Sequence, residues 1–243
     1  IHGCIEELKA LLALIKADLK NNPIAKHRII FVGDYVDRGP DSHAVIELML
    51  KLKKKGKPVT FLCGNHEEKL LRACREPDER SLPGFIRYGG LQTLESYGLR
   101  SQEFLATLGK NPNKDAFKKL AKLTKKHVGK AHYGFLEQLE THTQEGDYFF
   151  CHAGVDPKRK LKKQEAEDLI WMREPFLSWN KPLEKVVVHG HTPHKRPELL
   201  PHRINVDTAC VYGATLTSLV LEASKQRFLS VPAARNYRKE AGL

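Results

Sequence analysis

Two short polar runs carry the side chains of this chain that are best suited to chemistry. The run GDYVDRG at 33–39 follows the apolar stretch RIIFV at 28–32, and the run GNHE at 64–67 follows PVTFL at 58–62. Each run lies where a strand is expected to end and a helix to begin, which is where open α/β folds build active sites. The two loops offer a carboxylate, an amide, an imidazole and a guanidinium, which suit the binding of metal ions and phosphate.

Three more histidines occupy comparable positions. His152 follows the apolar run at 148–151, His191 follows the run at 186–188, and His2 stands beside a glycine at the start of the chain. One histidine after a strand is more often structural than functional. His189 stays ambiguous, because it stands two residues before His191 and would point the same way if the strand continues. Five such sites in chain order are hard to explain by packing alone. Mixed oxygen and nitrogen ligands suit Mn²⁺, iron or Zn²⁺ better than Ca²⁺.

Composition describes an ordinary globular chain. Its 243 residues are 41% apolar and 29% charged, which allows one large α/β domain or two small ones. We find no apolar run of membrane-spanning length and no signal peptide, so we expect a cytoplasmic protein without a membrane partner. The scattered cysteines read as reduced thiols, not as a disulfide framework: Cys4, Cys63, Cys74, Cys151 and Cys210.

The net charge of +12 favours phosphorylated or polyanionic partners. Most of the lysines nevertheless read as solvated helix faces. No basic array interleaved with aromatic residues is present, so we expect no nucleic acid as a partner.

Hydrophobic periodicity predicts the elements that position these loops. Spacings of three and four from Ile5 to Leu19 predict a helix that ends at Asn22-Pro23. A strand at 28–33, a helix after Ser42, a strand at 59–62 and a helix over 67–75 follow. This strand–helix order is typical of a mostly parallel sheet with right-handed crossovers.

The second half breaks this rhythm. We predict a mainly helical insertion over about 76–143, then strands at 148–151, 186–188, 203–206 and 215–221, the last two joined by a hairpin-like turn at Tyr212-Gly213. We expect a loosely held polar tail from Pro232 and a single domain over 1–243. The chain opens inside a loop motif without an initiator methionine, so we expect residues upstream of Ile1.

The motifs in order, GDxxDRG, GNHE, HAG and GHTP, form a specific signal. From Ile1 to about Leu221 the chain resembles the phosphoprotein phosphatase family within the calcineurin-like metallophosphoesterases, most closely its bacterial and phage members. The resemblance implies an α/β (α+β) fold: a β-sandwich flanked by helices, with two metal ions at loops on one edge. The ions would be Mn²⁺, with iron or Zn²⁺ as alternatives.

The resemblance also implies a role for each motif residue. His2 would bind the first metal and Asp34 would bridge both, whereas Asn65, His152 and His191 would hold the second. His66 would be the general acid, oriented by Asp37, and two guanidinium groups would bind phosphate oxygens: Arg38 and Arg173. Catalysis would then be in-line attack by a water or hydroxide that bridges the metals, without a covalent enzyme intermediate.

Two departures from the family pattern stand out. The aspartate of the family's GDxHG block would lie two residues before His2, outside the printed sequence. The family's HGG block reads His152-Ala153-Gly154, a small-for-small change. In addition, the region between the GNHE and HAG blocks is unlike the eukaryotic enzymes and resembles bacterial members.

These features predict a metal-dependent phosphomonoesterase that acts on phosphoserine or phosphothreonine in proteins, or on small phosphate esters. The alternative is a hydrolase of dinucleoside polyphosphates such as diadenosine tetraphosphate, or another nucleotide phosphoesterase. That group usually lacks the aspartate that matches Asp37, which favours the monoesterase. A third hypothesis is a catalytically inactive binding module, against which the intact His66, Asp37, Arg38 and Arg173 argue. The sequence leaves the oligomeric state open.

Overall fold

Strand β1 (Ile29–Phe31) pairs in parallel with β2 (Val59–Phe61) in the computed structural model, which describes residues 1–223 and 225–242. Helix α1 (Ile5–Asn21) precedes β1, α2 (Ser42–Lys54) connects the two strands, and α3 (Asn65–Arg75) follows β2. The predicted strand–helix order of the first half is therefore confirmed. Parallel pairing brings the carboxyl ends of β1 and β2 to the same edge.

A second sheet has five strands in the order β3-β4-β5-β7-β6. Its members are β3 (His142–Glu145), β4 (Tyr148–Cys151), β5 (Val186–His189), β7 (Arg203–Asn205) and β6 (Glu198–Leu199). Strands β4, β5 and β7 are mutually parallel, and the two outer strands pair antiparallel. The carboxyl ends of β4 and β5 therefore also lie together.

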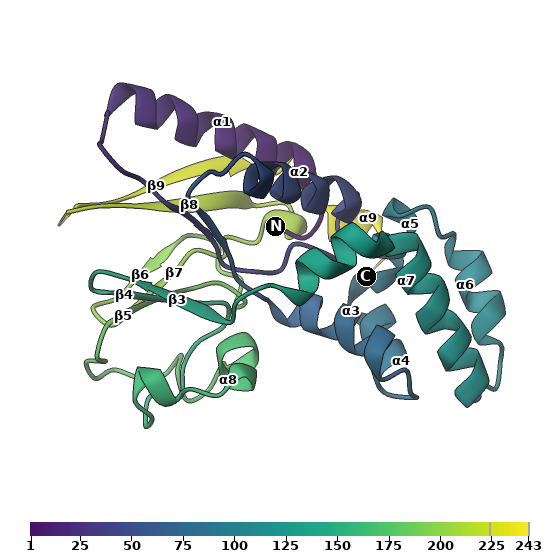
Figure 1. Cartoon of the computed structure of the whole chain (residues 1–243). Helices are drawn as coiled ribbons and strands as arrows, with labels where there is room; N and C mark the ends of the chain where they lie inside the picture. The colour runs from purple at the N-terminus through teal and green to yellow at the C-terminus, as the bar shows by residue number, and fades with distance from the viewer. Residues whose placement is uncertain (224, 243) are drawn as a thin grey trace.

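Alternate residues of β4 and β5 face different layers, as the period of two in a strand requires. Phe149 and Val187 pack toward α8 (Ala166–Trp171), whereas Phe150 and Val188 pack into a core shared with β1, β8 and β9. Figure 1 shows the five-stranded sheet lying opposite β8 and β9, with α1 on the outer side of that hairpin. The strands thus form a sandwich between helices, as the fold prediction requires.

The hairpin predicted around Tyr212-Gly213 is wrong. Strand β7 pairs with β5 and β6, whereas β8 (Thr215–Glu222) pairs antiparallel with β9 (Lys225–Pro232). After β7 the chain leaves the five-stranded sheet, passes through a 3-10 turn at Cys210–Tyr212 and starts a separate hairpin. The prediction failed because β9 opens with polar residues and its pattern gives no clear strand signal.

The C-terminal tail also differs from the prediction of a loosely held segment. Helix α9 (Tyr237–Glu240) buries Tyr237, whose hydroxyl donates to Glu7 Oε1 at 2.7 Å. The amide of Ala234 donates to the same oxygen at 3.0 Å, so the tail is anchored to the first turn of α1.

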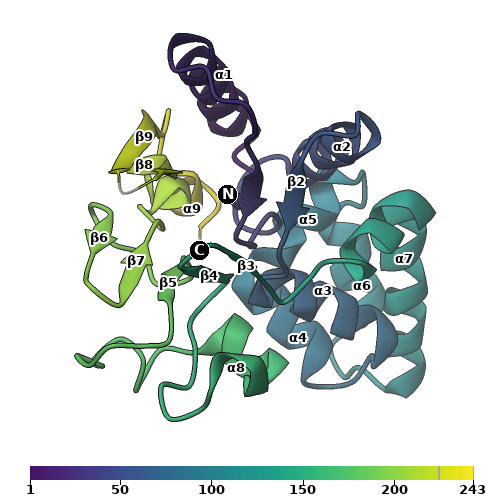
Figure 2. The same ribbon diagram turned by 60° about the vertical axis from the view of Figure 1, so that its left-hand side comes forward.

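The predicted helical insertion contains several helices: α4 (Ser81–Phe85), a π-helical turn at Ile86–Gly90, α5 (Leu91–Ser96), α6 (Ser101–Leu108) and α7 (Lys114–Glu137). A short 3-10 turn at Leu161–Lys163 precedes α8. In Figure 2 the helices α4 to α7 lie with α3 on one side of the molecule, and β4 to β9 lie on the other. No helix within the described residues is long and apolar enough to cross a membrane.

Candidate metal centre

The ends of four strands bring the predicted metal ligands together. Asp34 follows β1, the GNHE run opens α3 after β2, His152 follows β4, and His191 follows β5. The amide of His2 donates to the carbonyl of Asp34 at 2.8 Å, which places the start of the chain beside the same edge. The structure thus gathers all five predicted ligands: His2, Asp34, Asn65, His152 and His191.

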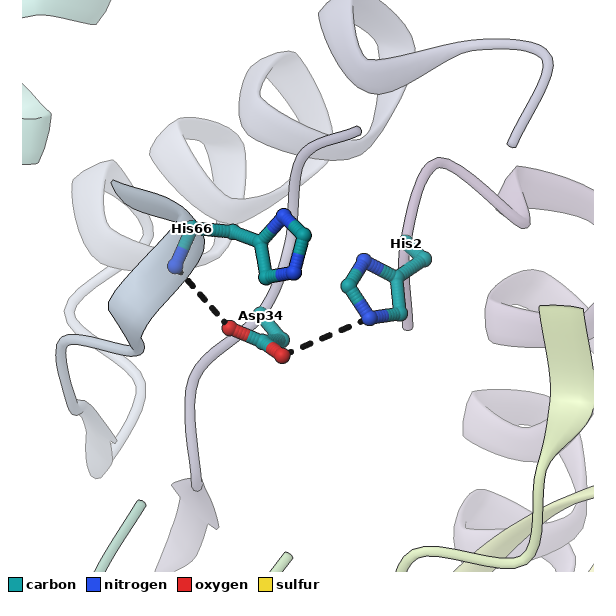
Figure 3. A group of neighbouring side chains, drawn as sticks. All are labelled: His2, Asp34 and His66. Carbon is teal, nitrogen blue, oxygen red and sulfur yellow. Dashed lines mark hydrogen bonds and ion pairs between the residues drawn. The ribbon is translucent and has the colours of Figure 1, made fainter. Parts of the chain in front are cut away.

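The first group of donor atoms comes from His2, Asp34 and His66 (Figure 3). His2 Nε2 lies 3.3 Å from Asp34 Oδ2, and the backbone amide of His66 donates to Asp34 Oδ1 at 3.3 Å. The candidate ligand atoms of the three side chains lie within 4.8 Å of one another. The geometry therefore admits His66 to a metal site, although the family pattern does not use it as a ligand.

The second group shares Asp34 with the first and adds His152 and His191. His152 Nε2 lies 3.3 Å from Asp34 Oδ1, 3.2 Å from His191 Nδ1 and 3.0 Å from Asn65 Oδ1. Asn65 Oδ1 is also 2.9 Å from His191 Nδ1. Because Asp34 belongs to both groups, one carboxylate could bind two ions through its two oxygens.

Backbone carbonyls fix which ring nitrogens face the cluster. His2 Nδ1 lies 2.8 Å from the Val36 carbonyl, and His152 Nδ1 lies 2.7 Å from the Val32 carbonyl. A carbonyl only accepts, so each Nδ1 carries the proton and each Nε2 presents a lone pair to the cluster. Lone pairs that converge on carboxylate and amide oxygens need a cation between them, so these residues fit divalent metal ions.

The electrostatics keep the cluster in its metal-binding protonation state. Burial lowers the pKa of His191 to about 3 and also lowers the pKa of His152. Burial works against ionisation of Asp34, but the neighbouring histidines hold the pKa of its carboxyl well below the usual range. The imidazoles are therefore neutral and the carboxylate ionised at neutral pH, as metal ligands must be.

His66 and Asp37 form a buried pair beside the cluster. His66 Nδ1 lies 2.7 Å from Asp37 Oδ2, and both side chains are at most 1% exposed. Thr93 donates to the other Asp37 oxygen at 2.7 Å, and the amide of Asp37 donates to Ser42 Oγ at 3.1 Å. The carboxylate fixes the ring's orientation and tautomer, so His66 Nε2 is directed toward the cluster. Sequence reasoning missed both residues. Thr93 lies 56 positions from Asp37, and Ser42, only five positions away, reads as an ordinary residue of a helix start.

The two predicted arginines contact different histidines of the site. Arg38 Nη1 donates to His2 Nε2 at 2.9 Å, and the exposed Arg173 donates through Nη2 to the His191 carbonyl at 3.4 Å. Both arginines line a cavity of about 700 Å³. The five candidate ligands line the same cavity, and we call them the metal-type cluster: His2, Asp34, Asn65, His152 and His191. Apolar side chains of α1, β1 and β8 also line this cavity. An anion held between His2 and His191 would therefore have a guanidinium group near each of these histidines.

The family model for calcineurin-like phosphoesterases matches residues 1–216. The chain belongs to the calcineurin-like phosphoesterase family. It is accordingly a metallophosphoesterase and a hydrolase, and its family uses divalent metals. The metal identity stays a proposal.

Curated relatives of this calcineurin-like phosphoesterase are named asymmetrical bis(5'-nucleosyl)-tetraphosphatases PrpE. The protein from Oceanobacillus iheyensis is 28% identical over 95% of this chain and 92% of its own length. That from Bacillus subtilis is 27% identical over 98% and 93% of the two chains. These names match the dinucleoside polyphosphate alternative better than the protein phosphatase prediction that was based on Asp37.

Solved structures support the fold of this phosphoesterase. A candidate diadenosine tetraphosphatase superposes with a TM-score of 0.63 at 23% identity, covering 96% of this chain and 90% of the other. The hypothetical protein PH1004 from Pyrococcus horikoshii gives 0.56 at 15% identity over 99% and 88%. Both matches cover nearly the whole of this chain.

Glu67 is a supporting residue of this phosphoesterase that sequence reasoning missed. Its buried carboxylate accepts the amides of Gly64 at 2.9 Å, Asp34 at 2.9 Å, Tyr35 at 2.7 Å and Val36 at 3.1 Å. Burial raises its pKa to about 7, although the backbone donors oppose that shift. Glu67 thereby ties the loop of Asp34 to the first turn of α3. A glutamate at the third position of a helix is a capping-box signal that could have revealed it.

Proposed function

We propose that this chain hydrolyses dinucleoside polyphosphates, with diadenosine tetraphosphate as the representative substrate. The observation that carries the proposal is the shared name of the curated relatives, which align over nearly the whole chain. Asymmetrical cleavage would give a nucleoside triphosphate and a nucleoside monophosphate. The converging ligand groups around Asp34 supply a site that suits phosphate hydrolysis.

We propose that His2, Asp34, Asn65, His152 and His191 hold two divalent ions, with Mn²⁺ as the first to test. Bound ions of this kind lower the pKa of water and neutralise phosphate charge. The tautomers set by the Val32 and Val36 carbonyls keep the Nε2 lone pairs available to them.

In this proposal the chain's own residues bind the polyphosphate and move a proton. Arg38 and Arg173 bind non-bridging oxygens on either side of the cluster, because guanidinium groups match phosphate geometry with paired donors. His66 Nε2 delivers a proton to the leaving oxygen, while Asp37 holds the other ring nitrogen. A leaving phosphate needs this proton less than a leaving alkoxide does.

The same pair supports a second candidate function, hydrolysis of phosphoserine or phosphothreonine esters. A buried His66–Asp37 pair serves a poor leaving group best, because an alkoxide must be protonated as it departs. This observation keeps protein phosphatase activity as the second candidate.

Competing substrates with Mn²⁺-loaded protein test both candidates. We expect kcat/KM for diadenosine tetraphosphate to exceed that for a phosphoserine peptide by about tenfold or more, in line with the usual spread of substrate discrimination. Chromatography should show ATP and AMP as products, not two molecules of ADP. Preference for the phosphopeptide would establish the second candidate. No turnover of either substrate by metal-loaded protein would indicate a binding module.

A further inference from the structure

Two aromatic rings face one ammonium group beside the metal-type cluster. Lys69 Nζ lies 4.4 Å from the centroid of the Tyr88 ring and 4.5 Å from that of the Trp171 ring. The two rings therefore stand no farther apart than the sum of these distances. We call Tyr88, Lys69 and Trp171 the aromatic slot.

Three separate elements build the aromatic slot. Lys69 lies one turn after His66 on α3, Tyr88 belongs to the π-helical turn at Ile86–Gly90, and Trp171 ends α8. The Tyr88 ring meets the His66 ring edge-on at 6.0 Å, and the Trp171 ring meets the His191 ring edge-on at 6.2 Å. The slot thus spans the space between the candidate acid and a candidate ligand of the second metal.

Both rings are accessible from the site. Tyr88 is 40% exposed and Trp171 is half-buried, and both line the cavity that holds the metal-type cluster. Aromatic faces left open beside a phosphate site are suited to stacking with a planar ring, and every nucleobase has such a face. The slot lies beside the cluster, where a nucleoside attached to the reacting phosphate would extend.

Lys69 is a displaceable occupant of the slot. Burial against the two rings lowers the pKa of its ammonium group. Cation–π contacts at partly exposed sites are weak, and the four-carbon stem of lysine is flexible. A neutral base could therefore replace the ammonium between the rings, which frees Lys69 to contact the polyphosphate.

We propose that Tyr88 and Trp171 bind a nucleobase of the substrate and that Lys69 then binds its phosphate chain. The inference rests on the proposed function and deepens it, because it assigns a nucleoside subsite to the phosphoesterase. The ligand class is a purine or pyrimidine nucleotide. A phosphoserine peptide has no group that requires this slot.

Tryptophan fluorescence tests binding without turnover. The chain has two tryptophans, so a Trp179→Phe protein emits from Trp171 alone. Trp179 does not line the cavity, so its replacement should leave the site intact. Its ring contacts Lys181, whose ammonium group lies 5.7 Å from the ring centroid. AMP should quench Trp171 emission strongly, whereas inorganic phosphate, which lacks the base, should not. Equal effects of AMP and phosphate would overturn the subsite.

Variants at Tyr88, the other ring of the aromatic slot, provide a second test. Tyr88→Ala should weaken AMP binding and lower kcat/KM for diadenosine tetraphosphate by about tenfold or more, the usual loss for one stacking partner. Tyr88→Phe keeps the ring and should restore both. If Tyr88→Ala binds AMP as tightly as Tyr88→Phe does, the stacking proposal is overturned.

These experiments distinguish failure of the nucleoside subsite from failure of the proposed function. Quenching by AMP that depends on the Tyr88 ring, in a protein that does not hydrolyse diadenosine tetraphosphate, would support the nucleoside subsite and reject the proposed function. Hydrolysis of diadenosine tetraphosphate at equal kcat/KM by Tyr88→Ala and Tyr88→Phe would reject the subsite and keep the proposed function.

Discussion

Backbone strain is concentrated at the residues of the metal centre. Seven non-glycine residues within the described chain have positive φ, and five of them are predicted site residues: His2, Asp34, Asp37, Arg38 and His191. A left-handed conformation is costly for residues with a Cβ and persists only where the surrounding structure enforces it. The fold therefore holds these five side chains in place at a cost to stability.

His66→Asn tests the assignment of the general acid. We expect turnover of an alkyl phosphate to fall by about 10²- to 10⁴-fold, because no proton reaches the leaving alkoxide. Loss of turnover should be smaller for diadenosine tetraphosphate, whose leaving group is a phosphate. Steady-state kinetics on both substrates, together with metal analysis by plasma mass spectrometry, measures these effects.

Metal content decides how His66 acts. Its side chain lies within 4.8 Å of candidate ligand atoms on His2 and Asp34, so a ligand role is geometrically open. Retention of full metal by His66→Asn agrees with an acid, and loss of one metal per chain shows a ligand. The matched control is His43→Asn, an exposed histidine that does not line the cavity.

The buried His189 should make the stability of the fold sensitive to acid. Its ring is fully buried, edge-on to Phe176 at 5.0 Å, and burial lowers its pKa to about 3. Below about pH 6.5 the unfolded imidazole binds a proton that the folded one does not. The unfolding free energy should therefore fall as pH falls from 6.5 toward 3, by up to about 1.4 kcal/mol per pH unit from this residue.

Urea titrations at several pH values between 7 and 5 measure this effect. A chelator should be present, so that release of metal from neighbouring ligands does not contribute. His189→Gln should flatten the pH dependence relative to wild type, whereas His27→Gln, at an exposed histidine, should leave it unchanged. Equal slopes for wild type and His189→Gln would contradict the prediction.

At the scale of elements, Glu67 connects α3 to the loop after β1. Glu67→Gln replaces one accepting oxygen with an amide donor, so buried backbone amides of that loop lose their acceptor. Each unsatisfied donor costs about 1–3 kcal/mol. Because the same bonds position Asp34, we expect Mn²⁺ affinity to fall by about 10- to 100-fold, as with other residues that orient metal ligands.

Calorimetric Mn²⁺ titration and thermal unfolding test the role of Glu67. Glu76→Gln is the matched control, because Glu76 caps the other end of α3 and its carboxylate forms an exposed ion pair with Arg72. An unchanged Mn²⁺ affinity in Glu67→Gln would show that Asp34 is positioned by other contacts.

The elements that the sequence predicted are those with strong local signals. Helix α1 ends close to the predicted Asn22-Pro23, and β1 and β2 coincide with short β-branched runs. The partner choice of β8 could not be predicted in this way, because register and pairing depend on the whole sheet. The anchoring of Tyr237 by Glu7 joins residues 230 positions apart, and no local pattern encodes that contact.

In the candidate site too, the residues with local sequence signals were predicted and those that depend on remote contacts were not. Spacing and residue type located the ligands, because the motif residues stand at strand ends, where parallel pairing forces them together. The residues that orient them were missed where the partner is remote, as with Thr93, which donates to Asp37 across 56 positions. Tyr88 and Trp171 were missed because an aromatic residue in a helix looks like a core residue until its exposure is known.

At the scale of the whole molecule, the site lies between regions of different character. The sandwich supplies the strand ends, and the helices α3 to α7 flank them on one side (Figure 2). The chain as a whole carries a net charge of +12. A positive molecule attracts a polyanion before contact, so charge should influence how fast the substrate arrives and not how fast it reacts.

Ionic strength separates these two effects. Raising it from about 0.1 to about 1 M shortens the Debye length from about 10 Å to about 3 Å. We expect kcat/KM for diadenosine tetraphosphate to fall by about tenfold or more, since electrostatic steering commonly contributes that much. The kcat at saturating substrate should change little, because the ion pairs inside the site are shielded from salt. A phosphate monoester carries less charge and serves as the control, so its kcat/KM should fall less steeply. An equal fall for both substrates would mean that salt acts on the protein, through metal loss or unfolding, and that the basic surface does not guide the polyphosphate.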